Sequence, residues 1–337
     1  MDEATEADNP RRMECLWFED GSIILHAGSM QYRVHRSVLA MHSPVFKDML
    51  AFPQPADSEL IDGCPVVHLP DPEVEVTPFL RALYDPQFFQ AFPARTTFTH
   101  LFGCLRLGHK YGVDYLRRRA LVHLSSIFRT TLSEWDASSY DEGDCDRITW
   151  TWSVPVEKTS FICAIQLARE VEALWVLPTA FYCLSGDWQF EELREKIFRE
   201  VVYDGITANL SIQDQHDFVV GFYAQMASTF KAMEFLSGRP WIIEGCTSTQ
   251  DCLIERLRVL ELSQEMIHTY SSPLEVWSSR DWDLLENLCP HCLAELKQKH
   301  EEIRQAFWDE LPQMYGLPPW NELEKMKSDA IGTDLLF

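Results

Sequence analysis

The chain has 337 residues, and 46% of them are hydrophobic, which is enough for two domains with real cores and argues against wholesale disorder. Its formal net charge of −23 disfavours direct binding to nucleic acid or to anionic membranes, because both present negative charge to the protein. No apolar signal region opens the sequence, and no stretch reaches the ~20 apolar residues of a membrane helix. We therefore expect an intracellular protein, cytoplasmic or nuclear, whose ten cysteines are thiols or metal ligands and not disulfides.

The first predicted elements are an acidic tail and a β-hairpin. Residues 1–13 are rich in acidic and polar side chains and are expected to be disordered. In 22–27 and 30–34 apolar residues alternate on either side of a Gly-Ser turn, which predicts the two strands of a hairpin. A third short strand is predicted at Val66–Leu69.

Helical spacing surrounds that third strand. Residues 38–50 fit two short helices that separate at Ser43, because serine is a good N-cap and Pro44 suits the first helical position. After the strand, the spacing of apolar residues predicts helices over 74–84, 97–111 and 113–127. The amino-terminal half therefore has the fold class α+β.

An acidic stretch between residues 133 and 148 is the clearest boundary in the chain. Polar segments of this kind pack poorly and usually connect domains. We therefore expect an α+β domain over 14–130, an acidic linker or loop over 131–155, and an all-helical carboxyl-terminal domain over 156–330. A long surface loop within a single domain is the alternative interpretation.

The order of hairpin, two helices, short strand and three helices resembles the BTB/POZ fold. The residues that carry the resemblance lie over about 15–128 and are Asp20-Gly21-Ser22, Val34-His35-Arg36, Leu39-Ala40, Ser43, Phe46, Met49, Leu69-Pro70-Asp71, Phe79, Leu83, Tyr84, Lys110-Tyr111-Gly112-Val113 and Leu116. One departure is Tyr84-Asp85-Pro86, which stands where family members often have a Tyr-Thr-Gly turn.

Within the family, the sequence is similar to the expanded BTB proteins of mushroom-type (basidiomycete) fungi. Those proteins have a helical carboxyl-terminal region that ends in a Leu-Pro…Gly-Leu-Pro-Pro-Trp motif. Here the motif is Leu311-Pro312 followed by residues 316–320.

The resemblance implies a protein-interaction module without catalytic residues. BTB domains self-associate, many bind the amino-terminal helices of a cullin to recruit substrates for ubiquitylation, and others recruit transcriptional corepressors. For this chain it implies a cullin contact near Val74, Phe79 and the Tyr111–Tyr115 junction. We expect a protein-binding adaptor or scaffold whose partner is a cullin or a second copy of itself. The alternative is a homo-oligomeric transcriptional or structural regulator with no ubiquitin-ligase role.

Four cysteines of the carboxyl-terminal half form two pairs, Cys246 with Cys252 and Cys289 with Cys292. A capping box at 248–251 and the proline after Cys289 place both pairs at helix amino termini, where the helix dipole favours thiolate. Four thiolates can close a tetrahedral site, so we hypothesise one structural zinc ion. Buried thiols without a metal are the alternative, and His291 could replace one thiol.

The sequence contains none of the common catalytic or nucleotide-binding motifs, such as G-x-S-x-G, H-E-x-x-H or G-x-x-x-x-G-K. His300-Glu301-Glu302 lacks the second histidine that zinc hydrolases need, and is better interpreted as part of a solvated helix face. We therefore expect no enzyme, no catalytic residues, no bound cofactor besides zinc and no small-molecule substrate.

Overall fold

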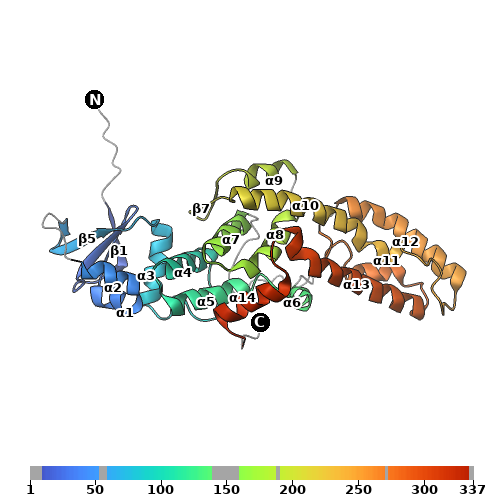
Figure 1. The fold of residues 1–337 in the computed structure, drawn as a ribbon, viewed down its shortest axis with the longest axis horizontal. Coiled ribbons are helices and arrows are strands. Elements are labelled where there is room, and N and C mark those ends of the chain that lie inside the picture. Colours follow the sequence, from blue (N-terminus) through green and yellow to red (C-terminus); the bar gives the residue numbers. More distant parts are fainter. Residues whose placement is uncertain (1–9, 53–58, 139–158, 187–189, 270–271, 334–337) are drawn as a thin grey trace, which may run out of the picture.

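The computed structural model describes residues 10–52, 59–138, 159–186, 190–269 and 272–333. Figure 1 shows an elongated molecule with a β-sheet at one end and a group of long helices at the other. The amino-terminal half forms the sheet end, and the last helix of the chain returns to the middle of the molecule.

A five-stranded sheet, in the order β1-β3-β2-β5-β4, opens the fold. Its strands are β1 (Arg11–Trp17), β2 (Ile23–Ala27), β3 (Met30–Val34), β4 (Leu60–Ile61) and β5 (Cys64–His68). The predicted hairpin is β2 and β3, which pair antiparallel with Leu25 opposite Tyr32. β1 begins at Arg11, inside the segment 1–13 that was expected to be a tail, because it pairs parallel to β3.

The predicted amino-terminal helices are present; α1, α2 and α3 lie beside the sheet, and α4 and α5 extend from it toward the middle of the molecule (Figure 1). They are α1 (Arg36–His42), α2 (Pro44–Ala51), α3 (Glu73–Tyr84), α4 (Phe98–Lys110) and α5 (Asp114–Ser125). Ser43 caps α2 as expected, accepting a 3.0 Å hydrogen bond from the backbone N–H of Phe46. Its hydroxyl also donates to the carbonyl of Tyr111 at 2.5 Å, which ties α2 to the end of α4.

Helices dominate the carboxyl-terminal half. They are α7 (Thr159–Glu170), η2 (Leu174–Val176), α8 (Leu177–Ser185), α9 (Phe190–Ile197), α10 (Ile212–Ala232), α11 (Glu234–Ser237), α12 (Thr249–Thr269), η3 (Arg280–Leu285), α13 (Pro290–Met314) and α14 (Trp320–Ile331). Part of the expected linker, 131–155, forms a further helix, α6 (Leu132–Ser138), and the rest of it lies outside the described residues.

The expectation of an all-helical region is wrong at one place, where β6 (Val201–Tyr203) and β7 (Ile206–Ala208) form a hairpin. The turn consists of Asp204 and Gly205, both with positive φ, which suits the tight turn of a two-residue hairpin. The first and third residues of each strand are buried and the middle one is exposed. An Asp-Gly pair between alternating apolar residues was therefore the signal in the sequence.

A single hydrophobic core joins the amino-terminal domain to most of the helical half, running from Leu16 to Ile331. Within it the indole of Trp175 donates a 2.9 Å hydrogen bond to Ser125 of α5, and α14 packs against α5. A second core lies among α11, α12, η3 and the start of α13. We call these elements the distal lobe and the rest of the described molecule the body. None of the described helices combines the length and the hydrophobicity that crossing a bilayer requires.

Candidate functional site

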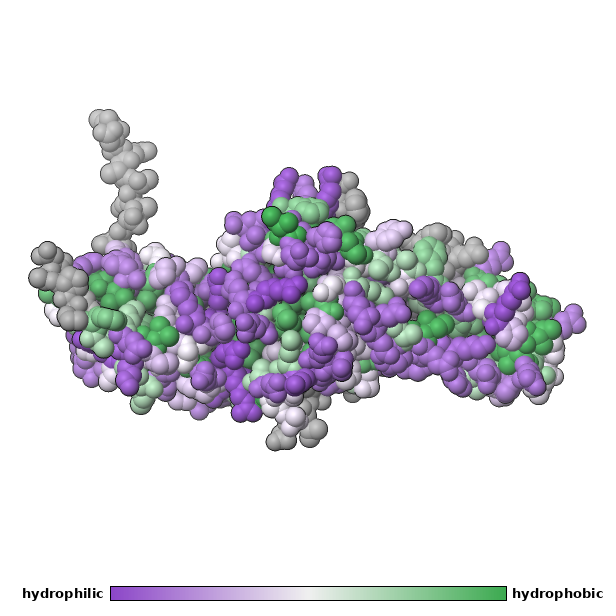
Figure 2. All heavy atoms as spheres, in the orientation of Figure 1, coloured by the Kyte–Doolittle hydropathy of each residue, from purple (hydrophilic) through white to green (hydrophobic). Residues whose placement is uncertain are grey.

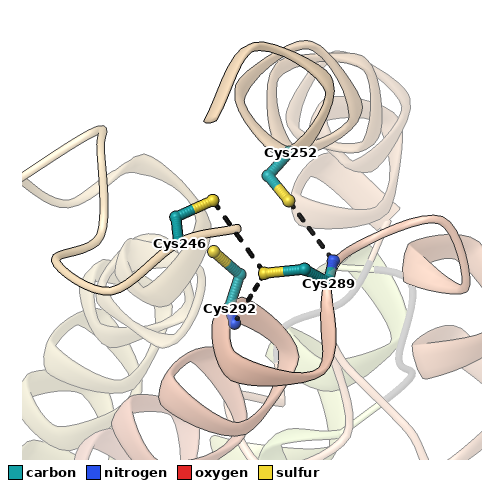
Figure 3. A group of neighbouring side chains, drawn as sticks. All are labelled: Cys246, Cys252, Cys289 and Cys292. Carbon is teal, nitrogen blue, oxygen red and sulfur yellow. Dashed lines mark hydrogen bonds between the residues drawn. The ribbon is translucent and has the colours of Figure 1, made fainter. Parts of the chain in front are cut away.

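The four cysteines that the sequence singled out lie together in the distal lobe (Figure 3). Their sulfur atoms all lie within 4.8 Å of one another, and the Sγ atoms of Cys246 and Cys289 are 3.9 Å apart. Sulfur atoms bound to one zinc ion at about 2.3 Å in a tetrahedron lie about 3.8 Å apart. The cluster therefore needs only small movements to hold a metal ion.

Helix starts position three of these thiols, as the sequence predicted, whereas Cys246 lies in the segment before α12. Cys252 lies in the first turn of α12, and Cys289 is the N-cap of α13, where its sulfur accepts from the N–H of Cys292 at 3.5 Å. The N–H of Cys289 in turn donates to the sulfur of Cys252 at 3.3 Å. Backbone N–H groups thus point at two of the sulfurs and favour negative charge on them.

The acidities of the thiols differ with their surroundings. The backbone N–H of Cys292, with that of Thr247, lowers the pKa of Cys289 to about 5. Burial raises the pKa of Cys252 and of Cys292, because both sulfurs lose contact with water. Cys289 is therefore the sulfur of the four that most readily becomes a thiolate, and the charge of a bound metal ion would favour ionisation of the others.

His291 does not belong to the cluster, although the sequence left it open as a ligand. Its Nε2 atom lies 2.6 Å from the carbonyl oxygen of Glu244, outside the group of sulfurs. Gly245 makes this contact possible, because a Cβ there would lie 3.0 Å from the same Nε2 atom and its φ is +84°. The four-thiol set is the one that the fold assembles.

Arg256 lies beside the cysteines and was not anticipated from the sequence. It lines a small cavity together with Cys246, Cys252 and Cys292, and only 2% of its surface is exposed. Its guanidinium donates to backbone carbonyls of the segment that leads to the cluster, those of Phe235, Leu236, Gly238, Pro240 and Trp241. Burial lowers the pKa of Arg256, and a negative charge on Cys292 would oppose that effect, so ionisation of this thiol would stabilise the buried cation.

A second candidate site lies on the amino-terminal domain. Met41 is 72% exposed at the end of α1, Val45 is 42% exposed at the start of α2, and Tyr115 is 42% exposed on α5. The rings of His42 and Tyr115 are 5.6 Å apart, and Val45 lies beside Gly112 just ahead of α5. We call Met41, Val45 and Tyr115 the α1–α5 patch.

The individual residues expected at a cullin contact lie differently. Phe79 and Tyr111 are core residues, 1% and 5% exposed, and their rings pack 5.7 Å apart. Val74 is half-buried beside Gly205 in the β6–β7 turn. Of the named residues Tyr115 alone is strongly exposed. The prediction named buried residues as well, because sequence spacing does not distinguish a core aromatic residue from a surface one.

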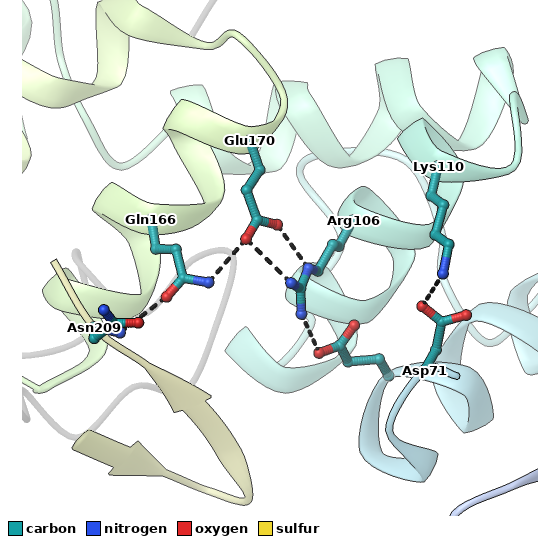
Figure 4. Close-up of polar contacts among 7 residues, drawn as sticks. Asp71, Arg106, Lys110, Gln166, Glu170 and Asn209 are labelled. Atoms are coloured by element: carbon teal, nitrogen blue, oxygen red, sulfur yellow. Dashed lines mark hydrogen bonds and ion pairs between the residues drawn. The ribbon is translucent and has the colours of Figure 1, made fainter. Parts of the chain in front are cut away.

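A polar network fixes the amino-terminal domain to the helices that follow it (Figure 4). Arg106 of α4 forms ion pairs with Glu75 of α3 at 2.7 Å and with Glu170 of α7 at 2.6 Å. Glu170 accepts from Gln166, which accepts from the backbone N–H of Asn209. Burial raises the pKa of Glu75 while Arg106 lowers it, so the carboxylate depends on this arginine for its charge.

Comparison with known proteins identifies the domain. Residues 21–127 match the family model of the BTB/POZ domain, and this range runs from the turn before β2 to just past α5. The chain has no match among curated proteins or among solved structures. The sheet, the helices beside it and the matched range agree with one another, and the chain therefore contains a BTB/POZ domain, a protein-interaction module.

Proposed function

We propose that this chain is an intracellular adaptor, cytoplasmic or nuclear, whose BTB/POZ domain binds a cullin while the carboxyl-terminal helical region holds a client protein. The BTB/POZ domain supports a role in protein interaction. The observation that carries the docking part is the α1–α5 patch, since exposed apolar side chains gain about 1.5–3 kcal/mol each when fully buried by a partner.

The first test is a calorimetric titration of the full chain with the amino-terminal domain of a BTB-binding cullin. We expect saturable binding that Met41→Glu weakens at least about tenfold, which corresponds to about 1.4 kcal/mol. Met326→Glu is the matched control, because it makes the same change on an exposed helix face of α14, where Met326 is 39% exposed. No binding by the folded parent chain would remove the ubiquitin-ligase version.

The second candidate is a homo-oligomeric transcriptional or structural regulator without a ubiquitin-ligase role. It is favoured by the same patch, because BTB domains also self-associate. The net charge of −23 disfavours direct DNA contact, so a transcriptional role would need a partner that binds DNA. Sedimentation velocity at micromolar concentrations tests it. A dimer that Met41→Glu dissociates supports this candidate, and a monomeric parent chain contradicts it.

We also propose that Cys246, Cys252, Cys289 and Cys292 hold one structural zinc ion. Four sulfurs, with backbone N–H groups directed at two of them and Arg256 nearby, match the preference of zinc for a closed tetrahedral thiolate site. Because four protein ligands leave no open position, this zinc would stabilise the fold and take no part in a reaction.

Metal analysis of the full chain, purified without chelator, tests this proposal. We expect about one zinc ion per chain, and its loss in the double variant Cys289→Ser/Cys292→Ser. Cys15→Ser serves as the control, since Cys15 is exposed on β1 and lies outside the cluster. Folded parent protein without bound zinc would contradict the proposal.

A further inference from the structure

The four sulfurs of the cysteine cluster differ in their access to solvent. Cys246 is half-buried, whereas Cys252, Cys289 and Cys292 are 5%, 8% and 3% exposed. Cys246 belongs to a surface segment before α12, in which Ile242 is 55% exposed. The start of α13 places the cluster near the end of the molecule that lies farthest from the sheet (Figure 1), and Figure 2 shows hydrophobic surface at that end. A small molecule that approaches the cluster from solvent therefore meets Cys246 first.

The cavity beside the cluster favours a very small reactant. Cys246, Cys252 and Cys292 line it together with apolar side chains, and its volume is about 10 Å³. That volume holds roughly one water molecule. Hydrogen peroxide is neutral and only slightly larger than water, so it is the oxidant of thiols that suits this position.

Cys246 and Cys289 are placed to form a disulfide (Figure 3). Their Sγ atoms are 3.9 Å apart, and the sulfurs of a disulfide lie about 2.05 Å apart. Cys246 belongs to no helix or strand, and Cys289 is the N-cap that precedes α13. Movement of the segment before α12 can therefore bring the two sulfurs together without unwinding a helix.

Cys289 and Cys292 form the competing pair. Both lie at the start of α13, where the N–H of Cys292 donates to the sulfur of Cys289 at 3.5 Å. Cys292 is the least exposed of the four cysteines and its backbone is part of the helix, so an oxidant reaches it less readily than Cys246. Access and freedom of movement both favour the pair of Cys246 and Cys289.

We propose that hydrogen peroxide converts Cys246 and Cys289 into a disulfide and thereby releases the zinc ion from the cluster. This inference rests on the zinc site proposed above. The Cys246 thiolate attacks one peroxide oxygen, the O–O bond breaks, and a sulfenic acid and a hydroxide ion form. The Cys289 thiolate then attacks the sulfenic sulfur, which forms the S–S bond and expels a second hydroxide ion. The two sulfurs together lose two electrons, peroxide gains them, and both hydroxide ions take up protons to become water.

The disulfide leaves too few ligands for the metal. A structural zinc site uses four protein ligands, and Cys252 and Cys292 supply only two. The new bond also joins the segment before α12 to the start of α13, which restrains the lobe after the metal has left. The cluster is thus a peroxide-sensitive switch in the lobe, separate from the BTB/POZ domain.

Titration of the full chain, purified with its zinc, with hydrogen peroxide tests this inference. A chromogenic chelator measures the released zinc, and mass spectrometry of proteolytic fragments, after the free thiols have been blocked, identifies the disulfide. We expect nearly complete loss of zinc, a Cys246–Cys289 cross-link, and renewed zinc binding after reduction with a dithiol.

Cys246→His separates oxidation from metal binding. Three thiolates and one imidazole also form a structural zinc site, but this variant cannot form the proposed cross-link. We expect peroxide to release its zinc at least about tenfold more slowly than that of the parent chain. Cys15→His is the matched control, because it makes the same change at an exposed cysteine on β1 outside the cluster, and should release zinc as the parent chain does.

Several results would overturn the inference. They are zinc that the parent chain retains in peroxide, a Cys289–Cys292 cross-link in place of the proposed one, and zinc release from Cys246→His as fast as from the parent chain. If Cys246→His binds no zinc, the cross-link found in the parent chain decides alone. Parent protein that contains no zinc before peroxide is added contradicts the zinc site itself, so the first reading tells the two failures apart.

Discussion

The body and the distal lobe are stabilised by different means. In the body, one continuous core reaches from the sheet to α14 and buries large side chains such as Phe46, Trp175 and Tyr315 almost completely. In the lobe, the described core is much smaller, and thiols make up part of it. The lobe buries less apolar surface and contains more polar contacts. Arg256 donates hydrogen bonds to carbonyls of residues 235–241, and the four sulfurs lie close together.

Small cores bury too little surface to offset the entropy of ordering the chain, and a metal ion is a common remedy. We therefore expect the body to be stable on its own and the lobe to depend on its cysteine cluster. Three experiments test that difference, beginning with the one expected to have the largest effect.

Removal of the proposed zinc ion should affect the lobe and leave the body intact. Structural zinc contributes about 10–16 kcal/mol in zinc-finger peptides, which exceeds what the small core of the lobe could supply in its place. We expect a strong chelator to abolish hydrogen-exchange protection in α11, α12 and the first turns of α13, and to leave α3, α4 and α5 protected. Added zinc should restore the pattern, whereas identical exchange with and without chelator would show that the lobe needs no metal.

A pair of tryptophan variants should act on one region each. Trp175→Ala removes a side chain that is 1% exposed and joins α5 to η2, and we expect it to destabilise the body by about 3–5 kcal/mol. Trp277→Ala removes a side chain that is 2% exposed from the core of the lobe. In chemical denaturation, only Trp175→Ala should lower the denaturant concentration at which the body unfolds. In competition with a chelator, only Trp277→Ala should lower the affinity of the chain for zinc. Equal effects of both variants on both readouts would mean that the regions unfold as one unit.

Acid should weaken the junction between the regions through His300. Its ring lies 4.9 Å from Phe235 and 5.5 Å from Trp282, and burial, with repulsion from Arg304, lowers its pKa from 6.5 to about 4. His300 becomes protonated below pH ~6.5 in the unfolded chain but only near pH 4 in the folded chain. The free energy of unfolding therefore falls as the pH is lowered from about 6.5 to about 4. The loss is at most about 3 kcal/mol.

His300→Phe keeps the ring packing and removes the titration. We expect its unfolding temperature to fall less between about pH 6.5 and pH 4 than that of the parent chain. Protonation of the zinc ligands would affect both proteins alike, and the difference between their pH profiles isolates the histidine. Parallel profiles would contradict this role of His300.

Much of the fold could be predicted from the sequence because its signals are local. Ser43-Pro44 marks the start of α2, and the alternation on either side of Gly28 marks the β2–β3 hairpin. The Asp204-Gly205 turn carried an equally local signal, but long helical spacing on both sides obscured it. The continuity of the body's core was not predictable, since contacts such as Trp175 with Ser125 join distant segments and leave no pattern in the sequence.

The candidate sites divide in the same way. The grouping of Cys289 and Cys292 follows from a short spacing and a helix start, and Arg256 lies one helical turn after Cys252 on α12. The hydrogen bonds of Arg256 to carbonyls of residues 235–241 leave no pattern in the sequence. The exposure of Met41 and the burial of Phe79 depend on which helix face meets the sheet, and apolar spacing alone leaves that open. The similarity to mushroom-type fungal BTB proteins stays a prediction.

Two long helices, α10 and α13, connect the body to the lobe. α10 has 21 residues and α13 has 25, so at 1.5 Å per residue they extend about 31 and 37 Å. They meet where Gly221 leaves room for the ring of Tyr315, whose hydroxyl donates to Gln225 at 2.7 Å. Because two helices packed against each other resist bending better than one, a protein bound to the lobe would be held away from the BTB/POZ domain.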